Sequence, residues 1–294
     1  MTNTAHIQAF FDEATFTVTY LVADPASKQA AVIDPVLDFD PASGRVSTGS
    51  AEAVLTAASE GGWTITRILE THAHADHLSA APFIKSRTGA RVGIGAEIGT
   101  VQQVFAGVFN APDVSGTGAE FDDLFADGAT FRIGELDVEV LHTPGHTPAC
   151  ISYRIGDAVF VGDTLFMPDY GTARADFPGG DAVALYRSIR RILALPPETR
   201  LFMCHDYKAP GRDHYAWETT VTDERANNVH IHDGVDEAAF VTMRKARDSG
   251  LAAPRLLLPS VQVNIRAGHL PPADANSVHY LKLPLRLPDG TAWS

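Results

Sequence analysis

Residues 70–82 read ETHAHADHLSAAP and place three histidines and one aspartate within a few positions. The preceding TRIL predicts a strand, so His72 and His74 lie two apart at its end and their side chains point the same way. A turn that follows brings Asp76 and His77 toward the same point. Imidazole and carboxylate groups suit Zn(II) or Fe(II), so this stretch predicts a metal site.

Three further metal-capable side chains follow predicted strands. His146 stands after a Pro-Gly turn in LHTPGHTPAC, Asp163 ends AVFVGD, and His205 ends LFMCH. An apolar strand that ends in one polar residue can aim a ligand from a rigid element. Each of the three alone is more typical of an ordinary turn or strand end. Together with the motif at 70–82, they complete seven candidate ligands.

The composition is that of a globular protein, with 45% hydrophobic and 20% charged residues among 294. The formal net charge of −13 argues against nucleic-acid binding, and an anionic substrate would need a local basic residue. No apolar run is long enough to span a bilayer, and the start lacks the regions of a signal peptide. Because Cys150 and Cys204 are too few for a disulfide framework, we expect buried thiols and a cytoplasmic protein.

The order of the predicted elements indicates two sheets with helices outside them. Strands and helices come first, a second run of strands follows from 128 to 162, and helices return after it. This order predicts an α/β fold, a four-layer αββα sandwich of two mixed sheets. We expect one domain over 1–294, with 235–294 as a C-terminal extension packed on it. We also expect a loop at 36–49, strand and loop at 255–294, and helices at 50–62, 77–89, 97–109, 181–193, 217–228 and 235–248.

The seven candidate ligands follow the order His-x-His-x-Asp-His, His, Asp, His. That set resembles the metallo-β-lactamase superfamily, and the resemblance covers roughly residues 10–230. It implies the αββα sandwich with the site at one edge, between the two sheets. It also implies one metal site of His72, His74 and His146, a second of Asp76, His77 and His205, and Asp163 as a bridge.

Two glutathione-linked groups of the superfamily fit better than the β-lactamases: the glyoxalase II thioesterases and the persulfide dioxygenases. CHDYKAPGR at 204–212 resembles the His-Asp-Tyr turn of the dioxygenases, where glyoxalase II typically has His-Glu-Tyr. GTARADFPGG at 171–180 resembles the dioxygenase pattern Gly-x-x-Arg-x-Asp-Phe-x-x-Gly, although that family often has Gly-Cys-Gly-Arg where this chain has GTAR. The insertion around 103–125 and the tail resemble a bacterial branch labelled β-lactamase hydrolase-like.

The dioxygenase resemblance implies one non-haem Fe(II) per chain, with His72, His146 and Asp163 as its ligands and open positions beside them. Glutathione persulfide, or a related thiol persulfide, would react there with O₂ to give sulfite and the thiol. The other four candidates would orient the ligands by hydrogen bonds: His74, Asp76, His77 and His205. Asp76, His77 and His205, together with Tyr207, are also the candidate catalytic residues.

The same resemblance implies the substrate-binding residues. Arg174 is a candidate for the glutathione carboxylate because its planar guanidinium suits bidentate pairing, although a surface salt bridge is an equal alternative. Asp176 lies on a matching position of the dioxygenase segment, and Tyr207 could position the substrate. The basic tail residues Arg266 and Lys282 could touch the substrate or a second subunit.

The alternative function is a dinuclear zinc thioester hydrolase of the glyoxalase II type, with two Zn(II) per chain and a bridging water as nucleophile. A non-catalytic scaffold would lack at least one ligand, and all seven are present.

The sequence has no rhodanese-type cysteine loop, so sulfur transfer would need a separate rhodanese. A homodimer is the common state of such enzymes. His230 and His232, in NNVHIHDG, are expected in a solvated turn.

Overall fold

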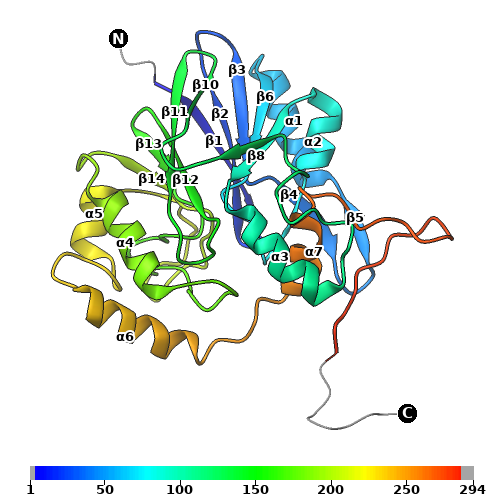
Figure 1. Cartoon of the computed structure of the whole chain (residues 1–294). Coiled ribbons are helices and arrows are strands. Elements are labelled where there is room, and N and C mark those ends of the chain that lie inside the picture. Colours follow the sequence, from blue (N-terminus) through cyan, green and yellow to red (C-terminus); the bar gives the residue numbers. More distant parts are fainter. Residues whose placement is uncertain (1–3, 286–294) are drawn as a thin grey trace, which may run out of the picture.

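The computed structural model describes residues 4–285 and contains two six-stranded sheets packed face to face (Figure 1). The first sheet begins with antiparallel hairpins and continues with parallel strands, because helices connect its later members. Its order is β1 (His6–Asp12), β2 (Thr17–Ala23), β3 (Gln29–Ile33), β6 (Thr64–Leu69), β8 (Arg91–Gly95) and β9 (Asp123–Phe125).

The second sheet is antiparallel except for one parallel pair, β13 with β14, which is joined by a crossover that contains a helix. Its order is β10 (Thr130–Ile133), β11 (Leu136–His142), β12 (Ile151–Ile155), β13 (Ala158–Phe160), β14 (Arg200–Phe202) and β15 (Glu218–Thr220). The polar residues that follow β11, β13 and β14 include His146, Asp163 and His205.

Strand β2 shows how the two-sided sheet separates two hydrophobic cores. Successive side chains of a strand point to opposite faces. Val18, Tyr20 and Val22 belong to the core between the sheets, whereas Leu21 and Ala23 belong to the core under the outer helices. Every residue of β2 is therefore buried.

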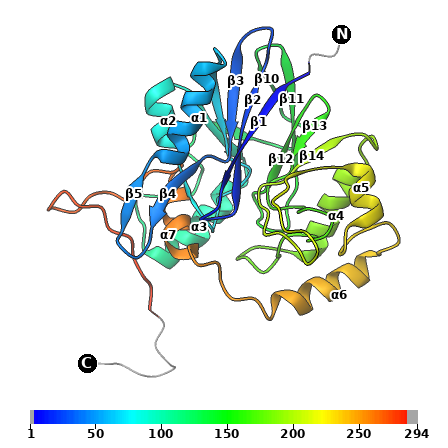
Figure 2. The same ribbon diagram turned by 180° about the vertical axis from the view of Figure 1, so that it is seen from behind.

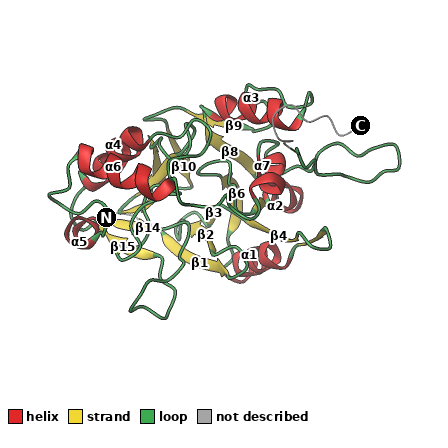
Figure 3. Ribbon diagram, turned by 90° about the horizontal axis from the view of Figure 1, so that it is seen from below, coloured by secondary structure: helices red, strands yellow, loops and turns green. Residues whose placement is uncertain are grey.

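Helices cover the outer face of each sheet (Figures 2 and 3). One group packs on the first sheet: α1 (Gly49–Glu60), α2 (Ala81–Thr88), α3 (Ile98–Phe109) and α7 (Leu257–Asn264). The other group packs on the second sheet: α4 (Ala182–Leu193), α5 (Val221–Asn227) and α6 (Glu237–Asp248). Among the helices of residues 4–285, none combines the length and apolar character needed to cross a bilayer.

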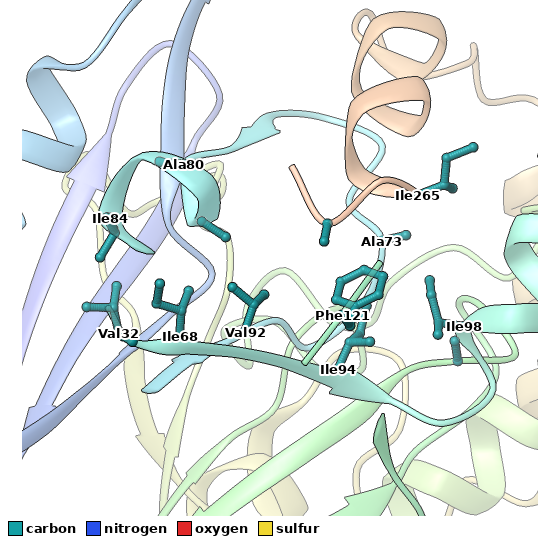
Figure 4. Close-up of a cluster of buried hydrophobic side chains, with 14 of the residues drawn as sticks. Val32, Ile68, Ala73, Ala80, Ile84, Val92, Ile94, Ile98, Phe121 and Ile265 are labelled. Carbon is teal, nitrogen blue, oxygen red and sulfur yellow. The ribbon is translucent and has the colours of Figure 1, made fainter. Parts of the chain in front are cut away.

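The outer core of the first sheet joins segments far apart in the sequence (Figure 4). Val32, Ile68 and Val92 come from β3, β6 and β8, and they share one buried cluster with Ile84 of α2 and Ile265 at the end of α7. The C-terminal segment is thus part of the core that supports the residues after β6.

The predicted α/β sandwich is confirmed, but the expected loop at 36–49 is wrong. It contains β4 (Val36–Asp40) and β5 (Arg45–Ser47), which form a small antiparallel sheet with β7 (Leu78–Ser79). Pairing with β7 overrides the loop-like composition of the segment. Because β7 uses these two residues, the helix expected at 77–89 begins only at Ala81.

Two further expectations need correction. Within the described residues, the tail at 255–294 contains helix α7 rather than a strand, because Pro259 lies in the first helical turn, where it removes no helical hydrogen bond.

The helix expected at 217–228 begins at Val221. The residues before it form edge strand β15, and Thr220 caps the helix by accepting a hydrogen bond from the Asp223 amide at 3.1 Å.

Gly145→Ala should destabilise the protein. Gly145 has φ +143°, and an added Cβ would lie 2.3 Å from the Cα atom of Leu185 in α4. Either the loop before His146 or the helix must move, so we expect a loss of about 2–4 kcal/mol in the free energy of unfolding, measured by urea denaturation. Gly107→Ala in α3 is the control, since nothing lies within 4 Å of its added Cβ. It should gain about 0.5–1 kcal/mol. Equal stability of the two variants would contradict this packing.

Candidate metal centre

All seven candidate ligands lie at one edge of the sandwich, in loops that follow strands. The loop after β6 carries the motif at 70–82, and the loops after β11, β13 and β14 carry one ligand each. The five histidines among the seven are almost completely buried: His72, His74, His77, His146 and His205. The sequence prediction that strand ends gather these side chains agrees with the structure.

One three-residue group consists of His72, His146 and Asp163. Their ligand atoms lie within 4.8 Å of one another. The Nε2 atoms of His146 and His72 are 3.6 Å and 4.0 Å from Oδ2 of Asp163. Two imidazoles and one carboxylate therefore face a single point, which is the donor set of a two-histidine, one-carboxylate metal site.

Hydrogen bonds fix the tautomers of both imidazoles. His146 Nδ1 donates to the Arg174 carbonyl at 2.9 Å. His72 Nδ1 lies 3.0 Å from the Thr71 hydroxyl, which already donates to Asp34, so this nitrogen is the donor to the hydroxyl oxygen. Both rings then present an unprotonated Nε2. Burial, together with the nearby histidines, also holds the pKa of His72 well below its usual value, so the ring is neutral and ready to bind a cation.

A second group lies beside the first and consists of His74, Asp76 and His77. The Nε2 atom of His74 is 2.9 Å from Asp34 Oδ1 and 3.3 Å from Glu70 Oε2. Burial opposes protonation of this ring, but the two carboxylates raise the pKa of His74 well above its usual value. Asp34 and Glu70 are partners of the motif that no local sequence pattern predicts.

His205 connects the two groups. Its Nε2 atom lies 3.1 Å from Asp76 Oδ2 and 3.3 Å from Asp163 Oδ1, while its Nδ1 atom lies 3.1 Å from the Phe16 carbonyl. Burial acts to raise the pKa of Asp76, but His205 and His77 outweigh it and hold this pKa well below its usual value. Asp76 is therefore a carboxylate at neutral pH.

The donor set fits a bound cation. A buried polar atom without a hydrogen bond costs free energy, so a group of such atoms facing one point needs a partner. Among the described residues, several buried atoms at this edge have no partner in hydrogen-bond geometry, although carboxylate oxygens lie close to His205 Nε2: His72 Nε2, His74 Nδ1, His77 Nε2, Asp163 Oδ1 and His205 Nε2. These histidine and aspartate clusters support a metal cofactor.

A cavity of about 260 Å³ opens beside this edge. Asp76, His146 and Asp163 form part of its wall. The remaining wall includes three aromatic side chains, three arginines and a histidine: Phe166, Tyr170, Tyr207, Arg174, Arg244, Arg247 and His230. The cavity could admit a small molecule to the candidate metal ligands.

The predicted substrate residues have different surroundings. Arg174 lines the cavity, but it forms a bidentate ion pair with Asp176 at 2.6 Å and 2.8 Å and donates to the Ala252 carbonyl. Its guanidinium is thus already paired, which is the salt-bridge alternative considered from the sequence. Tyr207 lies in the cavity wall, and burial together with Asp76 and other neighbours raises its pKa well above the usual value.

The basic tail residues and the two cysteines lie in surroundings that the structure defines. Arg266 pairs with Asp113 and the Lys282 ammonium donates to the Asn110 carbonyl, so neither lines this cavity. Cys150 and Cys204 are buried free thiols, as predicted.

The expectation of a solvated turn is wrong for His230, which lines the cavity, and right for His232, which is exposed. Thr172 donates its backbone N–H to His230 Nδ1 at 3.1 Å. Arg244 and Arg247 were also missed. Their spacing of three on α6 places both on one helical face, but the sequence alone does not show what that face meets.

Several known proteins resemble this chain. A β-lactamase hydrolase-like protein of Xylella fastidiosa is 49% identical over 290 residues, which cover 99% of this chain and 67% of that protein. Glyoxylase B2 of Dictyostelium discoideum is 45% identical over 288 residues, covering 97% of this chain and 98% of that protein. The mitochondrial persulfide dioxygenase ETHE1 of Homo sapiens is 28% identical over 265 residues, covering 89% and 88%.

The fold comparison agrees with these relatives. The crystal structure of ETHE1 from Myxococcus xanthus matches with a TM-score of 0.73 and 31% identity, covering 90% of this chain and 100% of that chain. The predicted resemblance to persulfide dioxygenases is thereby confirmed. Residues 13–205 match the family described as the metallo-beta-lactamase superfamily. Since this match spans more than half of the sequence, the chain belongs to the metallo-beta-lactamase superfamily.

Proposed function

We propose that this protein is a non-haem Fe(II) persulfide dioxygenase that oxidises glutathione persulfide or a related thiol persulfide. The observation that carries the proposal is the separate group of His72, His146 and Asp163 beside an open cavity. A face of two histidines and one carboxylate is typical of iron oxygenases. The likeness in sequence and fold to ETHE1 proteins supports the same reaction.

The reaction balances without a further reductant. One persulfide, one O₂ and one water give one thiol, one sulfite and two protons, so the terminal sulfur loses the four electrons that O₂ gains. When bound, an iron(II) ion would supply the redox chemistry that activates O₂. The protein would hold it through His72, His146 and Asp163.

The neighbouring polar residues would orient the ligands and handle protons. His205 lies between the carboxylates of Asp76 and Asp163, so it can hold the orientation of both. His77 contacts Asp76 at 3.6 Å and the Thr17 hydroxyl at 3.4 Å. Tyr207, whose ring lies 5.1 Å from that of Tyr170, would enclose the substrate at the cavity wall.

A second candidate function is a dinuclear zinc thioester hydrolase. The observation that favours it is the second group of His74, Asp76 and His77, which could hold another ion. A relative named Glyoxylase B2 supports the same alternative. In that case the two groups together would hold two zinc ions.

Metal analysis and O₂ uptake distinguish the two functions. Protein expressed without added zinc should contain about one iron per chain, and glutathione persulfide should drive O₂ uptake with one sulfite formed per O₂. Two zinc ions per chain, no O₂ uptake and hydrolysis of a glutathione thioester would instead establish the alternative.

Ligand variants test which group holds the ion. Asp163→Ala should abolish stoichiometric Fe(II) binding, because a ligand is lost. His77→Ala should lower the affinity by about 10–100-fold but keep one ion per chain at saturation, because His77 only orients its neighbours. Calorimetric titration under anaerobic conditions measures both, and His214→Ala, at an exposed histidine, is the control. Equal loss of the ion in both variants would contradict the assignment.

A further inference from the structure

The cavity wall contains three arginines, and within the described part of the chain they differ in their partners. Arg174 is bidentate to Asp176, and Arg244 forms an ion pair with Asp248 at 2.7 Å. Arg247 also lines the cavity and is exposed, yet its guanidinium makes no ion pair or hydrogen bond with any residue in the described range 4–285. In a chain with a net charge of −13, such a cation is the local attraction that an anionic ligand requires.

His230 adds a fixed hydrogen-bond donor to the same wall. Its Nδ1 accepts the Thr172 N–H at 3.1 Å, so its proton is on Nε2, which makes no hydrogen bond within residues 4–285. The ring is held closely, because a Cβ added to Gly171 would lie 2.1 Å from its Nδ1. Burial and the nearby Arg247 and Arg244 lower the pKa of His230 to about 4, so the ring is neutral at pH 7.

We propose that Arg247 and the Nε2–H of His230 bind a carboxylate of the thiol that carries the sulfur. The same cavity contains the candidate metal ligands His146 and Asp163, so one ligand can place its sulfur near them and its carboxylate at Arg247. A guanidinium and a neutral N–H donor form charge-assisted hydrogen bonds that an uncharged thiol cannot make. This inference rests on the proposed function, because it names the substrate group that the site recognises.

Glutathione, the product thiol, is the probe for this subsite. Arg247→Met removes the charge but keeps much of the side-chain length, so the dissociation constant of glutathione measured by calorimetry should rise about tenfold or more. Lys245→Met removes the same charge from another exposed position of α6 that lies outside this cavity, and it should change the constant less than twofold. Equal constants for the two variants, or no binding by the unaltered protein, would overturn the proposal.

Steady-state kinetics distinguish the carboxylate subsite from the proposed dioxygenase reaction. With glutathione persulfide, Arg247→Met should raise KM about tenfold and leave kcat nearly unchanged. With cysteamine persulfide, which has no carboxylate, the variant and the unaltered protein should have the same KM. If O₂ uptake is absent but glutathione binding still depends on Arg247, the dioxygenase assignment fails and the subsite stands. If O₂ uptake is present and the substitution leaves KM for glutathione persulfide unchanged, the proposed carboxylate subsite is wrong and the dioxygenase assignment stands.

A different observation concerns the C-terminal helix α7. Asn264 at its end is buried, and its side-chain amide donates to the carbonyls of His74 and His77 at 2.8 Å each. Its Oδ1 accepts the Ser79 N–H at 2.9 Å. One amide thus bonds three backbone groups of the loop that carries four of the seven candidate ligands.

Further contacts hold α7 in place against this loop. Arg266 forms a bidentate ion pair with Asp113, and Gln102 of α3 donates to the Ile265 carbonyl at 2.9 Å. A Cβ added to Gly268 would lie 2.9 Å from the Ser79 carbonyl oxygen, so the backbones approach closely there. Figure 3 shows α7 beside α2 on the same side of the first sheet.

We infer that Asn264 is a positioning residue that fixes the backbone of the metal-binding loop before any ion is bound. Asn264 holds the backbone carbonyls of His74 and His77, and the imidazoles of these same two residues are candidate metal ligands. A loop that is already ordered loses less conformational entropy when an ion binds, so the amide should raise metal affinity.

Amide hydrogen exchange of the metal-free protein tests this role without turnover. Asn264→Ala should speed exchange of the Ser79 amide at least tenfold and lower Co(II) affinity about tenfold or more, with altered visible absorption bands. Asn264→Asp keeps the acceptor for Ser79 but loses both donors, so Ser79 should stay protected while Co(II) affinity falls.

Gln262→Ala is the matched control for these variants. Gln262 is a buried amide on the same helix, but it bonds Leu258 and Lys282 rather than the loop. It should leave both Ser79 exchange and Co(II) affinity unchanged. Unchanged Co(II) affinity in Asn264→Ala and Asn264→Asp, or the same loss in Gln262→Ala, would overturn the inference.

Discussion

One buried carboxylate, Asp34, ties together the strand ends that carry the candidate ligands. It follows β3 and accepts the Thr71 N–H at 2.7 Å and the Thr71 hydroxyl at 2.8 Å, lies 2.9 Å from His74 Nε2, and accepts a longer contact from the Cys204 thiol. Burial alone would raise the pKa of Asp34, but His74 and Thr71 hold it below its usual value. Because β3 and β6 belong to one sheet and Cys204 follows the other, this charge links both halves of the sandwich at its metal-binding edge.

The sequence predicts the candidate ligands well because each follows an apolar strand, and strand ends in a two-sheet sandwich meet at one edge. It cannot predict the contacts that hold them. Asn264 reaches a loop almost two hundred positions earlier, from a helix whose first turn contains Pro259 and whose sequence does not predict a helix. His230 similarly depends on a close approach to Gly171. Such pairings arise from tertiary packing and leave no local pattern.

Under the proposed function, a very acidic chain must accept an anionic thiol, and the cavity offers it a local cation. Its carboxylates Asp76 and Asp163 stand among the histidines, where a bound cation would offset their charge. Arg247, whose guanidinium has no partner among residues 4–285, lies on α6, in the segment that follows residues 13–205 matched by the family. The residues matched by the family thus supply the candidate metal ligands, while the C-terminal helices add to the same edge: α6 completes the cavity and α7 supports the loop.

The central claim is that a single ion is held by His72, His146 and Asp163. Anomalous difference maps from crystals loaded anaerobically with Fe(II), measured on both sides of the iron absorption edge, locate the ion directly. We expect one peak about 2.0–2.2 Å from the Nε2 atoms of both histidines and from an oxygen of Asp163. A peak bonded to His74, Asp76 and His77 instead, or two peaks of equal height, would contradict this account.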